Sequence, residues 1–224
     1  MHDKLRPEQL GEKPSWAPDA CLLLYCTGSD HSTGDLQIYH PTDGRREPVG
    51  RCVAGTPAAW ISSRYVCYIA PAETGGVYQL YDRESGRRQA LPLRTSIPDR
   101  GPGISISAQT SPTLSVAMTA IPSGTAHQVV YRYDLATHKL NRVAPGVLAA
   151  LSPVDSRIAF ATPGPNARVF LAQAPDWSPR PIASGVWDVA NLLWSPDGAL
   201  LAVGTLRSRR GADPTLGTWL YKVR

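Results

Sequence analysis

The sequence predicts an all-β domain built from one repeated unit, and two observations carry that prediction. The first is a tight corner, Trp194-Ser195-Pro196-Asp197-Gly198, followed at once by the apolar run 199–203. Pro196 lacks an N–H, Asp197 can accept a bond from its own backbone, and Gly198 tolerates positive φ, which is typical of a strand, a turn and a strand. The second is that weaker copies of this corner begin at Trp16, Trp60, Thr110 and Leu151, between 41 and 50 residues apart. A period near 40 to 50 residues in a strand-rich chain indicates a β-propeller with one repeat per blade.

Four strands are expected in each blade. The inner strands precede the corners, at 14–16, 57–60, 104–109, 148–151 and 190–194. The second strands follow the corners as apolar runs, at 21–25, 65–70, 114–118, 157–161 and 200–203. Near-continuous apolar runs favour strands covered on both faces by neighbouring blades. The third strands are expected at 36–39, 77–81, 129–133, 169–171 and 218–221, and the outer strands end near Val49, Leu91, Val143 and Ile182.

Two repeats have a clear turn sequence between the third strand and the outer strand. It reads Thr42-Asp43-Gly44-Arg45-Arg46 in the first repeat and Glu84-Ser85-Gly86-Arg87-Arg88 in the second. In the third repeat His138-Lys139 takes the same offset from its tyrosine. These segments predict hairpin turns that need a residue with positive φ.

The fifth repeat stops at Arg224, where its third strand ends, so its outer strand is missing. Residues 4–10 precede the first corner as the other outer strands precede theirs. We therefore expect residues 4–10 to close the ring as the outermost strand of the last blade, which leaves no long open edge. The whole chain, 1–224, is then one propeller domain of five four-stranded blades, with repeats at about 11–50, 51–94, 95–144, 145–184 and 185–224.

The corner, the apolar strand and the Tyr-Asp-x-x-Ser-Gly type of hairpin resemble the TolB-like relatives of the Trp-Asp propeller repeats. The resemblance covers all five repeats, although Trp60-Ile61-Ser62-Ser63 has lost both Pro and Asp. It implies a scaffold with a protein-binding surface, and it implies no catalytic residues.

Composition narrows the classes of protein. The net charge is +5, with arginines spread over every repeat and no interleaved aromatics, which argues against a nucleic-acid platform. No apolar stretch is long enough for a membrane span. The opening residues lack the apolar core of a secretory signal, which predicts a cytoplasmic protein, with export after removal of a leader as the alternative. The cysteines, Cys21, Cys26, Cys52 and Cys67, show neither metal spacing nor a disulfide framework, so we expect reduced, mostly buried thiols.

The positions of the acidic residues, and the lack of motifs for nucleophiles or metal ligands, argue against catalysis. The expected inner strands contain no Asp or Glu in their interiors, and acidic residues stand only at strand entrances (Glu12, Asp99, Asp188) and in corners. A glycosidase would need several carboxylates at the channel mouth, and this remains the alternative, together with a carbohydrate-binding propeller. No nucleophile motif, phosphate loop or metal spacing is found, so we expect no enzyme activity, no cofactor and no metal.

What remains is a binding surface on the face that carries the loops between blades. The candidate residues there are Trp187, Asp188, Arg51, Arg94, Asp99, Arg100, Arg207, Arg209 and Arg210. Arginine and tryptophan are the residue types most enriched at binding hot spots. We expect this face to bind a protein partner, with a small molecule or glycan as a further candidate ligand and with nucleic acid disfavoured. The pairs Arg45-Arg46 and Arg87-Arg88 lie on the opposite face, where we expect them to be structural.

Overall fold

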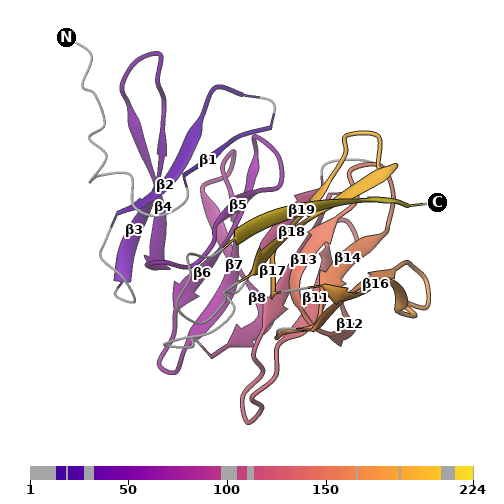
Figure 1. Cartoon of the computed structure of the whole chain (residues 1–224). Coiled ribbons are helices and arrows are strands. Elements are labelled where there is room, and N and C mark those ends of the chain that lie inside the picture. The colour runs from indigo at the N-terminus through magenta and orange to yellow at the C-terminus, as the bar shows by residue number, and fades with distance from the viewer. Residues whose placement is uncertain are drawn as a thin grey trace. The chain divides into compact units, whose positions relative to one another are not determined.

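The computed structural model describes residues 14–18, 20–27, 33–96, 105–109, 114–164, 166–186, 188–207 and 215–223 (Figure 1). Every helix or strand assigned within these ranges is a β-strand, which confirms the all-β prediction for this part of the chain. None of the described residues forms a helix that could cross a membrane. The chain divides into two compact units, residues 1–101 with 121–124, and residues 102–120 with 125–224.

The first unit contains two antiparallel sheets of four strands each, in simple up-and-down order. Sheet 1 consists of β1 (Ser15–Trp16), β2 (Leu23–Thr27), β3 (Thr33–Tyr39) and β4 (Arg46–Val53). Sheet 2 consists of β5 (Ala59–Trp60), β6 (Tyr65–Pro71), β7 (Gly76–Asp82) and β8 (Arg87–Thr95). Each sheet therefore corresponds to one predicted repeat.

The second unit contains the other three sheets, again antiparallel and in up-and-down order. Sheet 3 consists of β9 (Ile106–Gln109), β10 (Ser115–Ala120), β11 (Val129–Asp134) and β12 (Lys139–Pro145). Sheet 4 consists of β13 (Val147–Leu151), β14 (Ile158–Ala161), β15 (Ala167–Ala172) and β16 (Arg180–Val186). Sheet 5 consists of β17 (Asp188–Trp194), β18 (Leu200–Arg207) and β19 (Thr215–Lys222).

The second strand of each sheet is the most deeply buried, as its unbroken apolar sequence predicts. All six residues of β10 and all four of β14 are buried. Apolar side chains from neighbouring sheets supply the cover: Val66 and Tyr68 of sheet 2 pack with Leu24 and Ile38 of sheet 1. In the second unit, one cluster joins sheets 3 and 4 and another joins sheets 4 and 5. Within each unit, the core thus lies in layers between successive sheets.

The corner that begins at Trp194 forms as predicted. Asp197 accepts a bond from the backbone N–H of Ala199 at 3.0 Å, and Gly198 has φ of +65°. The expected hairpin turns also form, with Gly44 and Gly86 at positive φ. His138 takes the same left-handed conformation, φ +55°, at the place where the other repeats have glycine. The offset read from the sequence is therefore confirmed in all three repeats.

Among the described residues, sheet 5 has three strands in the order β17-β18-β19. The residues expected to complete it, 4–10, lie outside the described residues. The five sheets fit the five predicted blades.

One prediction about the cysteines is wrong. The structure joins Cys26 of β2 to Cys52 of β4 in a disulfide, whereas Cys21 is free and exposed and Cys67 is free and buried. β3 runs between the two bonded strands, and its residue opposite Cys52 is Gly34. A Cβ at position 34 would lie 1.9 Å from the Thr27 carbonyl oxygen and 2.8 Å from the Cys26 Sγ, so only glycine fits beside the backbone of β2 and the bridge. Burial raises the pKa of the Cys67 thiol to about 12, which keeps it protonated.

We predict that denatured, unreduced protein contains two titratable thiols, those of Cys21 and Cys67, because Cys26 and Cys52 are bonded to each other. The measurement is thiol titration in denaturant with and without prior reduction. Reduction should add two further thiols. Four thiols before reduction would contradict the disulfide.

Candidate functional site

The first unit holds two of the predicted binding residues. Arg51 lies on β4 and is exposed, and its Nη2 donates to the Thr33 hydroxyl at 2.6 Å. Arg94 lies on β8 and is also exposed. Each stands near the end of its outer strand, where the chain leaves the sheet.

Two further predicted residues lie at one end of sheet 5. Asp188 is the exposed first residue of β17 and pairs with Leu206 of β18. Arg207 follows as the last residue of β18, opposite Thr215 of β19. The register therefore brings Asp188 and Arg207 to the same end of this sheet. Trp187, Asp99, Arg100, Arg209 and Arg210 lie outside the described residues, so the predicted surface as a whole stays a prediction.

The basic pairs on the opposite face do have structural roles where their contacts are described. The Arg88 Nε donates to the Val49 carbonyl of sheet 1, and its guanidinium lies 5.6 Å from the centre of the Tyr81 ring. The Arg45 Nη2 contacts the His40 ring, at 3.0 Å from its Nε2. These contacts confirm the structural interpretation of Arg45 and Arg88.

The half-buried carboxylates of the first unit are engaged in ion pairs. Glu47 of β4 accepts from the Arg83 Nε at 2.9 Å and lies 3.2 Å from the His40 Nε2. Asp82 accepts from Arg64 at 2.9 and 2.8 Å. The hydrogen bonds from Arg64 hold the pKa of Asp82 well below its usual range. The Asp82 carboxylate is therefore a stable anionic partner of Arg64 and is poorly suited to proton transfer.

The corner carboxylate of sheet 4 is engaged in the same way. Asp155 accepts from the backbone N–H of Arg157 at 3.0 Å and from its Nε at 2.8 Å. Arg157 in turn donates to the Gly198 carbonyl at 2.9 Å, in the corner of sheet 5. Within the described ranges no cluster of His, Cys, Asp and Glu could hold a metal ion. Of the three strand-entrance acids, only Asp188 belongs to the described residues, so the carboxylate set of a glycosidase is not assembled among them.

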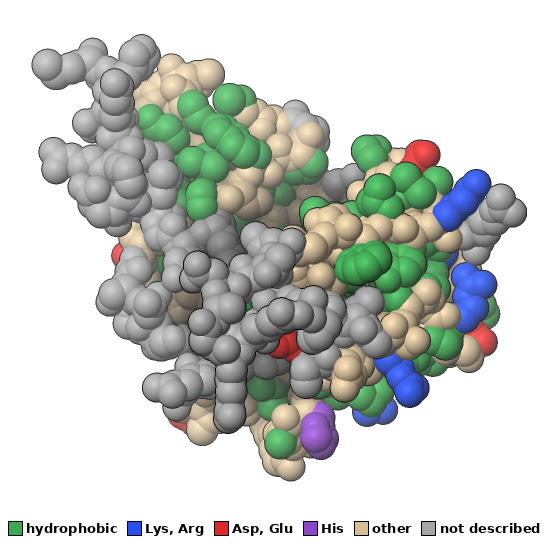
Figure 2. Space-filling view, in the orientation of Figure 1, with side chains coloured by type: hydrophobic (Ala, Val, Ile, Leu, Met, Phe, Trp, Pro, Cys, Tyr) green, Lys and Arg blue, Asp and Glu red, His purple; other side chains and the backbone are tan. Residues whose placement is uncertain are grey.

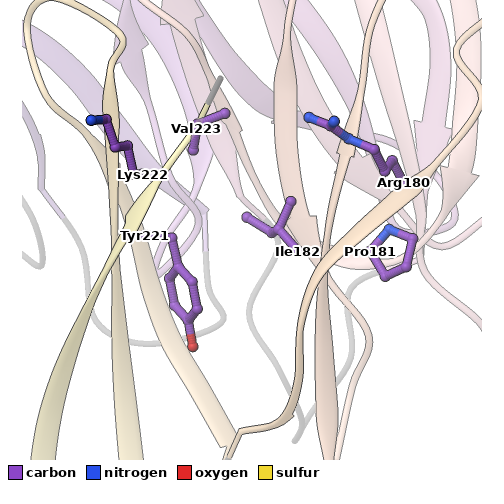
Figure 3. Close-up of a pocket in the computed structure, with 6 residues that line it drawn as sticks. All are labelled: Arg180, Pro181, Ile182, Tyr221, Lys222 and Val223. Carbon is purple, nitrogen blue, oxygen red and sulfur yellow. The ribbon is translucent and has the colours of Figure 1, made fainter.

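Sequence reasoning missed a groove between the edge strands of sheets 4 and 5 (Figure 3). Its volume is about 320 Å³, and its lining comes from Arg180, Pro181 and Ile182 of β16 and from Tyr221, Lys222 and Val223 at the end of β19. Ile182, Tyr221 and Val223 point into the gap, and Arg180 reaches toward it from the opposite strand (Figure 3). The lining residues of the two strands, such as Arg180 and Tyr221, are 41 positions apart, so no local pattern could have revealed this site. The one signal of the groove in the sequence is Tyr221, the aromatic residue near the end of the third strand of the fifth repeat.

Sheet 5 also exposes large apolar side chains. Leu193, Trp219 and Leu220 are 60, 53 and 69% exposed. Leu193 and Leu220 flank Ala202 in the register and share one face, whereas Trp219 pairs with Val203 and lies on the face toward sheet 4. Figure 2 shows apolar side chains uncovered over this part of the molecule, with Lys and Arg at the rim. An uncovered apolar patch rimmed by charge is typical of an interaction site.

Comparison with solved structures identifies the fold. TolB from Acinetobacter baumannii matches with a TM-score of 0.55 and 18% identity, over 83% of this chain and 46% of that one. The β-propeller domain of the trilobed protease from Pyrococcus furiosus matches with a TM-score of 0.65 and 10% identity, over 94% and 67%. A puromycin-hydrolyzing peptidase from Mycobacterium tuberculosis matches with a TM-score of 0.57 and 14% identity, over 86% and 33%.

The fold is a β-propeller. Five sheets in successive repeats fit five blades. The chain spans about half the length of TolB and a third of the peptidase, and identities this low show the fold alone. No protein-family model matches the chain, and no curated protein matches its sequence. The neighbours include TolB, a domain of a protease and a peptidase, so the propeller fold by itself assigns no activity.

Proposed function

We propose that this chain is a non-catalytic, TolB-like propeller that binds a protein partner through its fifth blade and the loops beside it. The observation that carries the proposal is the exposure of Trp219 at the edge of sheet 5, next to the groove lined by Tyr221 and Arg180. Tryptophan, tyrosine and arginine contribute most of the binding energy at protein interfaces, because they combine apolar area with specific polar contacts. Asp188 and Arg207 belong to the same sheet, which supports the surface predicted from the sequence.

The absence of catalysis in this proposal is supported by how the charged groups are used. Asp82 and Asp155 each accept hydrogen bonds from arginine, and the pKa of each carboxyl group lies below its usual value. General acid catalysis by a carboxyl group needs the opposite shift. Structural ion pairs between and within blades account for these groups without a reaction.

We further propose that residues 4–10 complete sheet 5 as its fourth strand. Sheets 1 to 4 each have four strands, whereas among the described residues β19 has a partner strand on one side only. On the face away from sheet 4, Leu193, Leu200 and Leu220 are exposed. In a closed ring that face would gain a neighbouring blade, as the face with Leu201 and Val203 has sheet 4. Open edges and bare apolar faces favour aggregation, which closure prevents.

Deletion of residues 1–10 should therefore lower the melting temperature by several degrees, by about 2 to 4 °C for each kcal/mol lost, and should promote aggregation. Circular dichroism melting and light scattering of the full and shortened chains measure both effects. A shortened chain that melts within about 1 °C of the full chain and stays monodisperse would contradict closure.

We propose an oxidising compartment as the place where the protein works, in place of the cytoplasm expected from the opening residues. The support is the disulfide between Cys26 and Cys52, because such bonds persist outside reducing compartments.

The binding proposal predicts that the immobilised full chain retains a specific protein from an extract of the organism that encodes it. Against that purified protein, Trp219→Ala should weaken binding by about 2 kcal/mol or more, and Trp187→Ala should do the same if the predicted surface is used. Trp16→Ala is the matched control, because Trp16 is 59% exposed but belongs to sheet 1.

Circular dichroism melting of each variant separates lost binding from lost folding. Retention of no protein above background would contradict the proposed function. Retention of a carbohydrate or an oligonucleotide in its place would support the alternatives instead. A partner that binds Trp219→Ala as tightly as the parent chain would remove blade five from the surface.

A further inference from the structure

Two tryptophans bond their inner strands to the inner strand of the preceding repeat, and both bonds follow one rule. The Trp60 indole N–H donates to the Ser15 carbonyl, and the Trp194 indole N–H donates to the Ala150 carbonyl. Each donor is the last residue of its inner strand, and each acceptor is the residue before the last one of the earlier inner strand. The rule therefore names one donor position and one acceptor position in every repeat that keeps the tryptophan.

The strand registers extend this rule to the two ends of the repeat series. The acceptor position is recognised by its partner in the second strand: Ser15 pairs with Leu24, Ala150 with Ala159 and Leu193 with Ala202. Leu193 is thus the acceptor position of sheet 5. Trp16, the last residue of β1, is the donor position of sheet 1.

Trp16 and Leu193 also differ from their equivalents in exposure. Trp60 packs in the core cluster of its unit and is 5% exposed, whereas Trp16 is 59% exposed. Ala150 is 7% exposed, whereas Leu193 is 60% exposed. Among the described residues, β17 has a partner strand on one side only. The donor position of the first blade and the acceptor position of the last blade are each open within their own unit.

We propose that in the closed ring the Trp16 indole N–H donates to the Leu193 carbonyl, so that the first and last inner strands are joined by the same bond as successive repeats. The inference rests on closure of the ring, which is part of the proposed function, and adds a contact that residues 4–10 do not make. Closure removes the carbonyl from water, and the indole N–H then satisfies it. The same contact covers the apolar part of the indole ring.

Hydrogen exchange of the indole groups, followed by NMR on the full chain with isotope-labelled tryptophan, tests the bond. The chain has six tryptophans, and the loss of one signal in each Trp-to-Phe variant assigns it. We expect the Trp16 indole to exchange at least about tenfold more slowly than N-acetyltryptophanamide, as the Trp60 indole should. A nuclear Overhauser contact from the Trp16 indole N–H to the α-proton of Leu193 or Trp194 should identify the acceptor strand.

Trp16→Phe keeps most of the apolar area and removes the donor. It should lower the melting temperature by about 2 to 4 °C, as Trp60→Phe should, because each variant loses one hydrogen bond. Trp219→Phe is the matched control, because Trp219 is 53% exposed, and it should shift the melting temperature by about 1 °C or less. If Trp16→Phe does not fold, exchange of the Trp16 indole in the parent chain still decides the question.

Three results would overturn the proposal: a Trp16 indole that exchanges as fast as N-acetyltryptophanamide, equal melting of Trp16→Phe and the parent chain, or protection only at concentrations where the chain self-associates. The third result would assign the contact to a second copy of the chain. If the Trp16 indole is unprotected while deletion of residues 1–10 still lowers the melting temperature, the inner contact fails and closure by the outer strand stands.

The test is independent of partner binding. The proposed partner surface lies at Trp219, so Trp16→Phe should bind a captured partner as tightly as the parent chain does. Failure of the Trp16 contact therefore leaves the proposed partner surface standing.

Discussion

Within each of the two units, hydrogen bonds join the inner strands of successive repeats, and the packing of the blades depends on these bonds. In the first unit, the Trp60 indole N–H donates to the Ser15 carbonyl at 3.0 Å. In the second unit, the Trp194 indole N–H donates to the Ala150 carbonyl at 3.0 Å. These partners are 45 and 44 residues apart, which is one repeat. A buried carbonyl left without such a donor costs about 1 to 3 kcal/mol, so the repeat length is tied to the packing of the sheets.

The fourth repeat lacks the tryptophan, and hydroxyl groups of the third repeat link the two inner strands in its place. Its inner strand ends on Leu151, and the backbone N–H groups of Ala149 and Leu151 donate to the Ser105 and Ser107 hydroxyls of the third repeat, both at 3.0 Å. The corners add a second link, because Arg157 bonds the Gly198 carbonyl and lies 5.1 Å from the centre of the Trp194 ring. Conserved geometry is thus reached through different side chains in different repeats.

Much of the fold could be predicted because its signals are local. Pro196, Asp197 and Gly198 encode a corner within three residues, and His138 was placed in its turn by its offset from Tyr133 alone. The disulfide could not be predicted from spacing, because Cys26 and Cys52 meet only when β3 lies between them and Gly34 leaves room. The role of Trp60 and Trp194 was also hidden, because their acceptors lie a full repeat away.

The candidate site depends on tertiary structure to a greater extent than the fold. Arg180 and Tyr221 belong to different repeats and meet only because β16 and β19 are the edge strands of successive sheets. Asp188 and Arg207, two of the residues predicted from the sequence, belong to the same sheet as Tyr221. Their common sheet follows from the order of the strands, which the repeat pattern predicts.

The central claim is that, within each unit, hydrogen bonds join the inner strands of successive repeats. The Leu151 amide tests this claim most directly, because it donates to the Ser107 hydroxyl. Its exchange with deuterium can be followed by NMR in the parent chain and in Ser107→Ala, which removes only the acceptor hydroxyl. The account predicts a protected amide in the parent chain and exchange about five- to tenfold faster in the variant, with the amides of β10 unchanged. An unprotected Leu151 amide in the parent chain, or equal exchange in both proteins, would contradict it.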